Sequence, residues 1–275
     1  MSNKLIGISG SLLIALGFTQ IYSFLSAIVG YVNAQEDFTF VWNYWMLLIF
    51  GLGLFILGVC LIRGRNFYFG SAIFVLCFTI FQGFSVYYYQ IRVLRDFEKN
   101  QPFEWSGTLL SLIGLVIFLL LLIGPKFISA KTDLDLNQNW KNKWRYASGL
   151  FSLFGMGVSV YTAITIFKQL YSTSSEQGYL FTTAFDAYFA CFLGLVFLLM
   201  AILAWWRVSY LLIGVLFGAA IILLTNYLWV TEWIGFAKTT LGITFGKNEH
   251  QVFGMQLLMG SSALIASVFA FIAKK

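Results

Sequence analysis

The sequence predicts an all-α membrane protein with eight transmembrane helices. The chain has 275 residues, of which 60% are hydrophobic and 10% are charged, and it contains 2 prolines. Its mean hydropathy is +0.83. A water-soluble globular protein needs more charge and less apolar surface than this, so the lipid bilayer is the solvent that fits the composition.

Eight apolar runs are long enough to be membrane spans, because a helix needs about 20 apolar residues to cross the hydrocarbon layer. They cover residues 5–31, 44–62, 67–89, 107–124, 147–170, 185–206, 210–230 and 252–272. The first run is longer than the apolar core of a signal peptide, which is about 7 to 15 residues. We therefore interpret it as a span, with a signal peptide cleaved after Ala34 as the alternative.

The distribution of charge predicts that both termini lie in the cytoplasm. The chain carries a net charge of +6, and most of its basic residues fall on one side of the predicted membrane. These residues are Lys4, Arg63, Arg65, Lys126, Lys131, Lys141, Lys143, Arg145, Arg207, Lys274 and Lys275. The positive-inside rule assigns that side to the cytoplasm and explains the charge without nucleic acid. We expect a multi-pass protein of the plasma (inner) membrane.

The two halves of the chain share one predicted topology, which indicates a parallel duplication of a four-helix unit. We divide the chain into a first four-helix bundle (1–125), a basic cytoplasmic connector (126–146) and a second four-helix bundle (147–275). The sequence similarity between the halves is weak. Chance resemblance between apolar helices is therefore the alternative to a true repeat.

Small residues recur at every fourth position of the first span and predict a helix-packing ridge. The ridge consists of Gly7, Ser11, Ala15, Thr19, Ser23 and Ala27. Such a ridge lets the backbone of a neighbouring helix approach closely, so we expect this span at the centre of its bundle. Gly214 and Gly218 form a similar GxxxG pattern in the seventh span. Packing within the monomer is favoured over a dimer face, because eight helices have many internal contacts to make.

Five polar residues within the spans are candidates for an outward-facing cavity. They are Gln20, Gln82, Asp186, Asn226 and Gln256. All five lie at mid-depth or in the outer half of their spans, and a polar side chain in hydrocarbon is costly unless it has a partner or water. The alternative is that each amide forms a hydrogen bond across a helix contact, while Asp186 reaches water at the outer boundary.

The end of the connector is a candidate interfacial helix. Trp140 and Trp144 are four residues apart and are interleaved with Lys141, Lys143 and Arg145. A short helix there would lie in the cytoplasmic interface, with its indoles in the membrane and its cations near anionic headgroups. Lipid sensing or partner docking is the functional interpretation. A simple topological anchor that joins the two bundles is the alternative.

Residue patterns that carry catalysis or metal binding are missing from the sequence. His250 is the single histidine and lies in a predicted outer loop, while Cys60, Cys77 and Cys191 lie within spans, where they resemble small hydrophobic residues. Charged residues near mid-membrane, which proton pumps need, are also missing. We therefore expect a protein that is not an enzyme and has no catalytic residue, metal site or cofactor.

These features favour a non-catalytic accessory or scaffold subunit that acts through helix packing. The expected partners are the bilayer, with anionic lipids at the cytoplasmic face, and a membrane-protein partner or a second copy of the chain. A small permease or lipophilic-ligand carrier is the alternative. Its outward-facing polar cavity would be lined by Gln20, Gln82 and Asn226.

Overall fold

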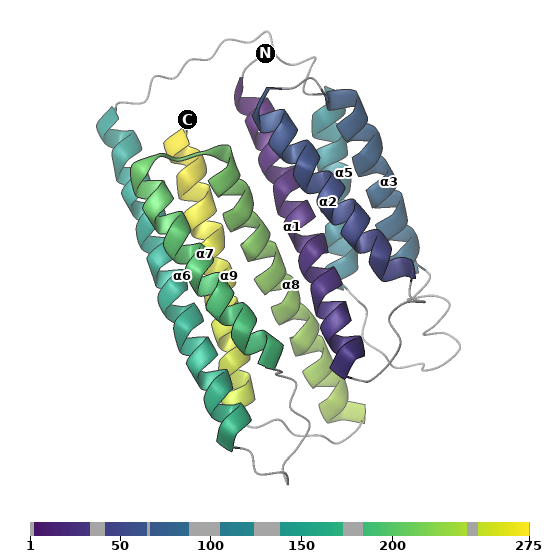
Figure 1. The fold of residues 1–275 in the computed structure, drawn as a ribbon, viewed down its shortest axis with the longest axis vertical. Coiled ribbons are helices and arrows are strands. Elements are labelled where there is room, and N and C mark those ends of the chain that lie inside the picture. The colour runs from purple at the N-terminus through teal and green to yellow at the C-terminus, as the bar shows by residue number, and fades with distance from the viewer. Residues whose placement is uncertain are drawn as a thin grey trace.

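The computed structural model describes residues 3–33, 42–64, 67–87, 105–123, 138–172, 184–240 and 247–274. Within these ranges the regular structure is entirely helical, which confirms the all-α prediction. The helices are α1 (Asn3–Asn33), α2 (Trp42–Ile62), α3 (Tyr68–Tyr87), α5 (Trp105–Ile123), α6 (Gln138–Ser172), α7 (Ala184–Trp206), α8 (Tyr210–Thr240) and α9 (Lys247–Lys274). They run along the long axis of the molecule, and both termini lie at the same end (Figure 1).

Seven helices in the described part of the chain are long and apolar enough to cross a membrane. In the remaining helix, α5, the apolar stretch from Thr108 to Leu122 is shorter than the other spans. The prediction of eight spans is thus met by seven helices, with α5 as the marginal one. A helical chain with seven such segments has the build of a multi-pass membrane protein.

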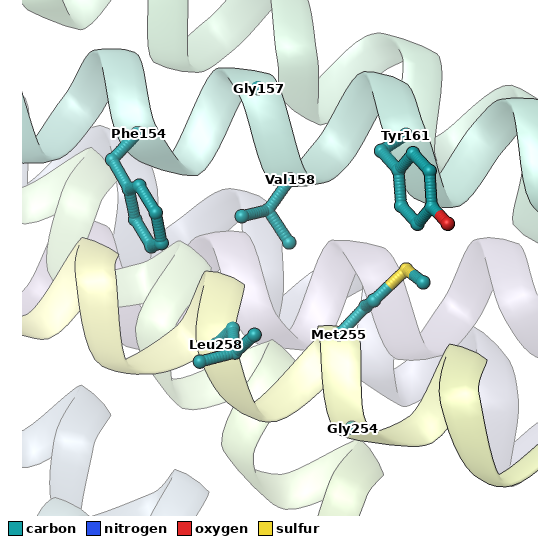
Figure 2. Close-up of a pocket in the computed structure, with 7 residues that line it drawn as sticks. All are labelled: Phe154, Gly157, Val158, Tyr161, Gly254, Met255 and Leu258. Carbon is teal, nitrogen blue, oxygen red and sulfur yellow. The ribbon is translucent and has the colours of Figure 1, made fainter.

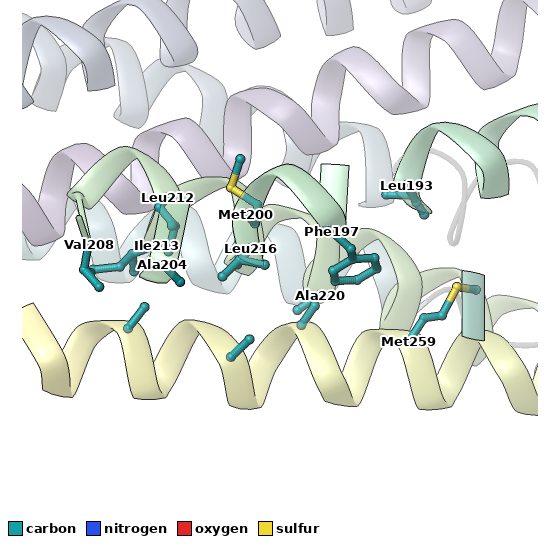
Figure 3. Packing of buried hydrophobic residues seen from close by; sticks show 14 of the residues in the cluster. Leu193, Phe197, Met200, Ala204, Val208, Leu212, Ile213, Leu216, Ala220 and Met259 are labelled. Atoms are coloured by element: carbon teal, nitrogen blue, oxygen red, sulfur yellow. The ribbon is translucent and has the colours of Figure 1, made fainter. Parts of the chain in front are cut away.

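Buried apolar side chains form two large clusters. The first core cluster joins α1, α2, α3 and α5, with one residue from α8, and consists of Leu13, Ala15, Leu16, Leu54, Leu61, Ala72, Val75, Phe78, Leu110, Ile117, Leu121 and Ile221. The second core cluster joins α7, α8 and α9 and consists of Leu193, Phe197, Met200, Ala204, Val208, Leu212, Ile213, Leu216, Ala219, Ala220, Leu223, Met259, Ala263, Ala266, Ala270 and Ala273. Figure 3 shows the side chains of α7 and α8 facing the small residues of α9.

Helix α1 lies between the two halves, with α2 on one side and α8 on another. A Cβ placed on Gly17 would lie 2.7 Å from the Gly51 carbonyl oxygen of α2. On the side of α8, a Cβ placed on Gly214 would lie 2.8 Å from the Ser11 carbonyl oxygen. These distances are too short for any side chain, so glycine is what allows α1 to approach both neighbours.

Helix α6 begins at Gln138 and continues without a break to Ser172. Residues 140–145, the candidate interfacial helix, lie in the first turns of this long helix. Helix α6 thus extends across the predicted boundary between the connector and the second bundle. The physical reason is that no proline or glycine stands between Gln138 and Ala147 to end the helix before the apolar run. The rest of the connector lies outside the described residues.

Candidate functional site

Gln20 is buried on the face of α1 that contributes to the first core cluster. It is 1% exposed, and neither its Nε2 nor its Oε1 has a hydrogen-bond partner in the described part of the chain. It follows Leu13 by seven residues and Leu16 by four, so it projects from the same face of α1 as these two fully buried leucines. A buried polar group without a partner costs about 1–3 kcal/mol, so this amide is a point of unused hydrogen-bonding capacity.

Gln82 projects from α3 towards the same cluster. It follows Val75 by seven residues and Phe78 by four, and both belong to the first core cluster. Its Oε1 is buried without a hydrogen-bond partner among the described residues, as is Oγ1 of Thr108 in α5. Unsatisfied polar atoms thus come from three neighbouring helices of the first half.

Asn226 joins α8 to α1. Its Nδ2 donates a hydrogen bond of 2.8 Å to the Tyr22 hydroxyl, and the Tyr22 ring lies 4.4 Å from the ring of Phe189 in α7. This amide therefore bonds across a helix contact, which was the alternative to a cavity. Gln256 is half-buried on α9, with an unpaired Oε1 within the described region, and the side chain of Asp186 lies outside the described side chains.

Among the small residues of the ridge, Gly7, Ser11 and Ala15 meet α8. Gly7 faces the Tyr210 ring, and the Ser11 hydroxyl donates to the Tyr210 carbonyl oxygen at 2.7 Å. Ala15 lies opposite Gly218. Farther along, Thr19 is buried, while Ser23 and Ala27 are half-buried. The ridge and the GxxxG pattern therefore pack on each other inside one chain.

The basic residues at the start of α6 have different roles. Arg145 donates to the carbonyl oxygens of Ala204, at 3.3 Å, and of Trp205 and Trp206, which end α7. Cations are favourable at a helix C-terminus, where carbonyl groups have no helical partner. Lys143 is exposed, and Lys141 is half-buried. No sequence signal links Arg145 to a helix end about sixty residues away, so its role as a cap emerges only from the fold.

The two tryptophans of the candidate interfacial helix are also placed by α6. The Trp144 ring lies 4.8 Å from the Phe269 ring of α9, and Trp144 packs against the second core cluster. The side chain of Trp140 lies outside the described side chains. Trp144 therefore contributes to packing between α6 and α9.

A groove of about 640 Å³ lies between α6 and α9 on the outer surface of the helix bundle. It is lined by Phe154, Gly157, Val158, Tyr161, Gly254, Met255 and Leu258. Figure 2 shows the Phe154 and Tyr161 rings at the two ends of the α6 segment, with Leu258 and Met255 opposite them. The lining is apolar, and Phe154, Tyr161 and Leu258 are exposed.

Two glycines keep the groove open. A Cβ placed on Gly157 or on Gly254 would meet no other heavy atom within 4 Å. These glycines differ from Gly17 and Gly214, where close backbone contact excludes any side chain. Helices α6 and α9, which carry these two glycines, are joined away from the groove by a hydrogen bond of 2.8 Å from the Ser148 hydroxyl to the Ala266 carbonyl oxygen. The groove is not predictable from the sequence, because no sequence pattern pairs α6 with α9.

Metal ligands are not clustered in the described region, which holds no group of three or more His, Cys, Asp or Glu side chains able to bind an ion. Comparisons of the chain with protein-family models, with curated proteins and with solved structures find no match. The functional interpretation therefore depends on the chain's own geometry.

Proposed function

We propose that this chain is a non-catalytic accessory or scaffold subunit that acts through helix packing with a membrane-protein partner or with lipid. The observation that carries the proposal is the contrast between a filled interior and an open outer groove. Gln20 is buried on α1, and Asn226 is bonded across the seam between α1 and α8. The groove between α6 and α9, by contrast, is apolar and opens outwards.

The proposal includes eight spans in the plasma membrane. Helix α5 has 19 residues, which is about 28 Å at 1.5 Å per residue and close to the roughly 30 Å of a hydrocarbon core. Eight crossings return the chain to its starting side, in agreement with termini at one end (Figure 1). Arg63, Lys143 and Arg207 are exposed near that end, which supports a cytoplasmic assignment.

The proposal also keeps the parallel duplication. In the first half the close helix pairs are α1 with α2 and α3 with α5. The corresponding pairs in the second half, α6 with α7 and α8 with α9, are close as well. Equivalent pairing in both halves supports an ancestral four-helix unit, although α9 also packs on α6, whereas α5 packs only weakly on α1.

Native mass spectrometry of the tagged full chain, released from its own membranes in a mild detergent, tests this function. We expect a second polypeptide in fixed stoichiometry or bound lipid, because an accessory subunit is defined by what it binds. Solute flux or chemical turnover by the purified chain alone, in liposomes and without a partner, would overturn the proposal.

A small carrier is the second candidate, and the unpaired amide atoms of Gln20 and Gln82 favour it. A ligand with polar groups could satisfy them, as the few polar residues in an apolar binding site usually do. A carrier requires that the double variant Gln20→Leu/Gln82→Leu lose ligand flux while Gln256→Leu keeps it. An accessory subunit requires that both variants still assemble with the partner.

A further inference from the structure

We propose that the groove between α6 and α9 binds one acyl chain of an anionic phospholipid, whose phosphate lies at Lys168. The proposal rests on the proposed function, because it selects lipid from the two partner classes named there. It commits to a phospholipid of the leaflet at the end of the molecule away from the termini. Three observations carry it, namely the register of α6, the shape of the groove and the position of the charge.

The register of α6 aligns Lys168 with the groove. Phe154, Tyr161 and Lys168 are spaced by seven residues, which is about 20° short of two full turns at each step, so they project from nearly one face. Phe154 and Tyr161 line the groove, and Lys168 is exposed. A lipid acyl chain that leaves the groove at Tyr161 therefore continues along α6 towards Lys168.

The groove begins at the depth of the acyl chains of one leaflet. At 1.5 Å per residue, Lys168 lies about 10 Å beyond Tyr161 and about 21 Å beyond Phe154 along the helix axis. Half of a hydrocarbon core of about 30 Å is about 15 Å. With the ammonium group of Lys168 at the headgroup level, the Tyr161 end of the groove lies among the acyl chains of that leaflet, and the Phe154 end reaches past the midplane.

Between Tyr161 and Lys168 on α6, the half-buried polar side chain is that of Thr165. The Thr165 hydroxyl donates to the Tyr161 carbonyl oxygen of its own helix at 2.9 Å, so its proton is already used. Among the described side chains of α6 and α9, Lys168 is the charged group at this end. Charge complementarity therefore points to an anionic headgroup.

The shape of the groove favours an acyl chain over a partner helix. A transmembrane helix packs along a ridge of small residues that extends over several turns. Here only Gly157 and Gly254 are small, and the exposed Phe154, Tyr161 and Leu258 surround them. A volume of about 640 Å³ falls within the roughly 300–1,000 Å³ of ligand pockets. A narrow flexible chain fits between these side chains, and a helix does not.

Two separable contributions are expected to hold the lipid. An acyl chain in the bilayer is already surrounded by hydrocarbon, so entering the groove gains no hydrophobic transfer energy. Retention therefore depends on close packing against the exposed glycine backbone. Selection among lipids depends on the headgroup charge at Lys168.

The first arm of the test fills the groove. The full chain is reconstituted in bilayers with equal amounts of phosphatidylglycerol and phosphatidylcholine of the same acyl length, extracted mildly, and analysed by native mass spectrometry. Gly157→Leu/Gly254→Leu should lose the retained phospholipid. The control Gly70→Leu/Gly83→Leu changes two glycines of α3 that are equally open but lie outside the groove, and it should keep the lipid. Equal retention by the two double variants would overturn the proposal.

The second arm removes the charge and does not depend on how the leucines are accommodated. Lys168→Gln should retain lipid but lose about fivefold of its preference for phosphatidylglycerol, the factor that corresponds to ~1 kcal/mol for one lysine near an anionic surface. Lys143→Gln, which changes an exposed lysine at the other end of α6, should keep the preference. An equal loss in both lysine variants, or none at Lys168, would overturn the proposal.

Native mass spectra of the groove-filled variant released from its own membranes, together with a flux assay, separate this inference from the proposed function. A second polypeptide that persists in the groove-filled variant, with unchanged lipid content, would contradict lipid binding at this site and leave the accessory function standing. Flux by the isolated chain would contradict the accessory function, whatever lipid is retained.

Discussion

The two halves of the molecule handle their buried polar groups differently. In the second half, short hydroxyl side chains of α6 bond to the backbone of neighbouring helices: Ser148 donates to Ala266 O at 2.8 Å, and Ser159 to Ala190 O at 2.6 Å. In the first half, Gln20, Gln82 and Thr108 bury polar atoms that have no hydrogen-bond partner among the described residues, and in the second half Gln256 Oε1 is such an atom.

This difference distinguishes polar groups that join two helices by a hydrogen bond from buried polar groups that form none. A serine hydroxyl carries one proton, and a single carbonyl on the next helix uses it, so the contact serves to fix helix positions. A glutamine amide offers more donors and acceptors than the apolar first core cluster can match. Buried polar atoms without a partner among the described residues are therefore more numerous in the first half than in the second.

The largest expected effect on stability comes from a substitution that separates α1 from α8, the contact between the two halves. Gly214→Ile should lower the free energy of unfolding by about 3 kcal/mol, because its Cβ would press on the Ser11 carbonyl oxygen. Denaturant unfolding of the detergent-solubilised protein measures this. Gly157→Ile is the matched control and should cost well under 1 kcal/mol, since its Cβ meets open space. Similar losses of stability in both variants would contradict the close packing of α1 on α8 at Gly214.

A smaller loss is expected at the turn between α7 and α8. Arg145→Met should lower the free energy of unfolding by about 2 kcal/mol, because hydrogen bonds from a charged donor to the last carbonyls of α7 are lost while the aliphatic stem is kept. In the described part of the equivalent turn after α2, the chain turns through Gly64, at φ 79°. Unchanged stability of Arg145→Met would show that this cap contributes nothing.

A gain in stability is expected when a buried amide without a hydrogen-bond partner is replaced by an apolar side chain. Gln20→Leu should raise the free energy of unfolding by about 1.5 kcal/mol, because an unpaired amide is replaced by an apolar side chain of similar size in an apolar cluster. Gln256→Leu should gain less, since this side chain is only half-buried. A loss of stability in Gln20→Leu, seen by thermal unfolding, would mean that the amide has a partner.

The smallest expected loss of stability comes from removing a serine hydroxyl that forms a hydrogen bond between helices. Ser148→Ala should cost about 0.6 kcal/mol, the average for a hydrogen bond between helices in a membrane protein. A double-mutant combination with Gln20→Leu should be additive, because the two residues belong to different halves. A coupling well above 0.5 kcal/mol would contradict the division between the halves.

Hydropathy predicted where the helices cross, but not where they end. The predicted span 210–230 lies within α8, which continues to Thr240, and the span 147–170 lies within α6, which starts at Gln138. Apolar content reports the hydrocarbon layer, whereas a helix continues into polar sequence until a residue stops it.

The candidate sites also include features that the sequence of one helix predicts and features that it does not. Spacing along one helix predicted the small-residue ridge of α1, because periodicity is a local property. Three other features depend on which helices become neighbours. They are the choice of α8 as the partner of that ridge, the cap formed by Arg145 and the groove that Gly157 and Gly254 line. That information is tertiary, and no single span contains it.

The central claim is that the interior is filled and the functional surface is the outside of the bundle. The most direct measurement is the labelling of Gln20→Cys by a membrane-impermeant maleimide in lipid nanodiscs, with Cys60, Cys77 and Cys191 replaced by alanine. Our account predicts that this thiol stays unmodified under conditions that fully label Lys143→Cys, which carries its thiol at an exposed position. Labelling of both at similar rates would contradict the account and indicate a water-filled cavity at Gln20.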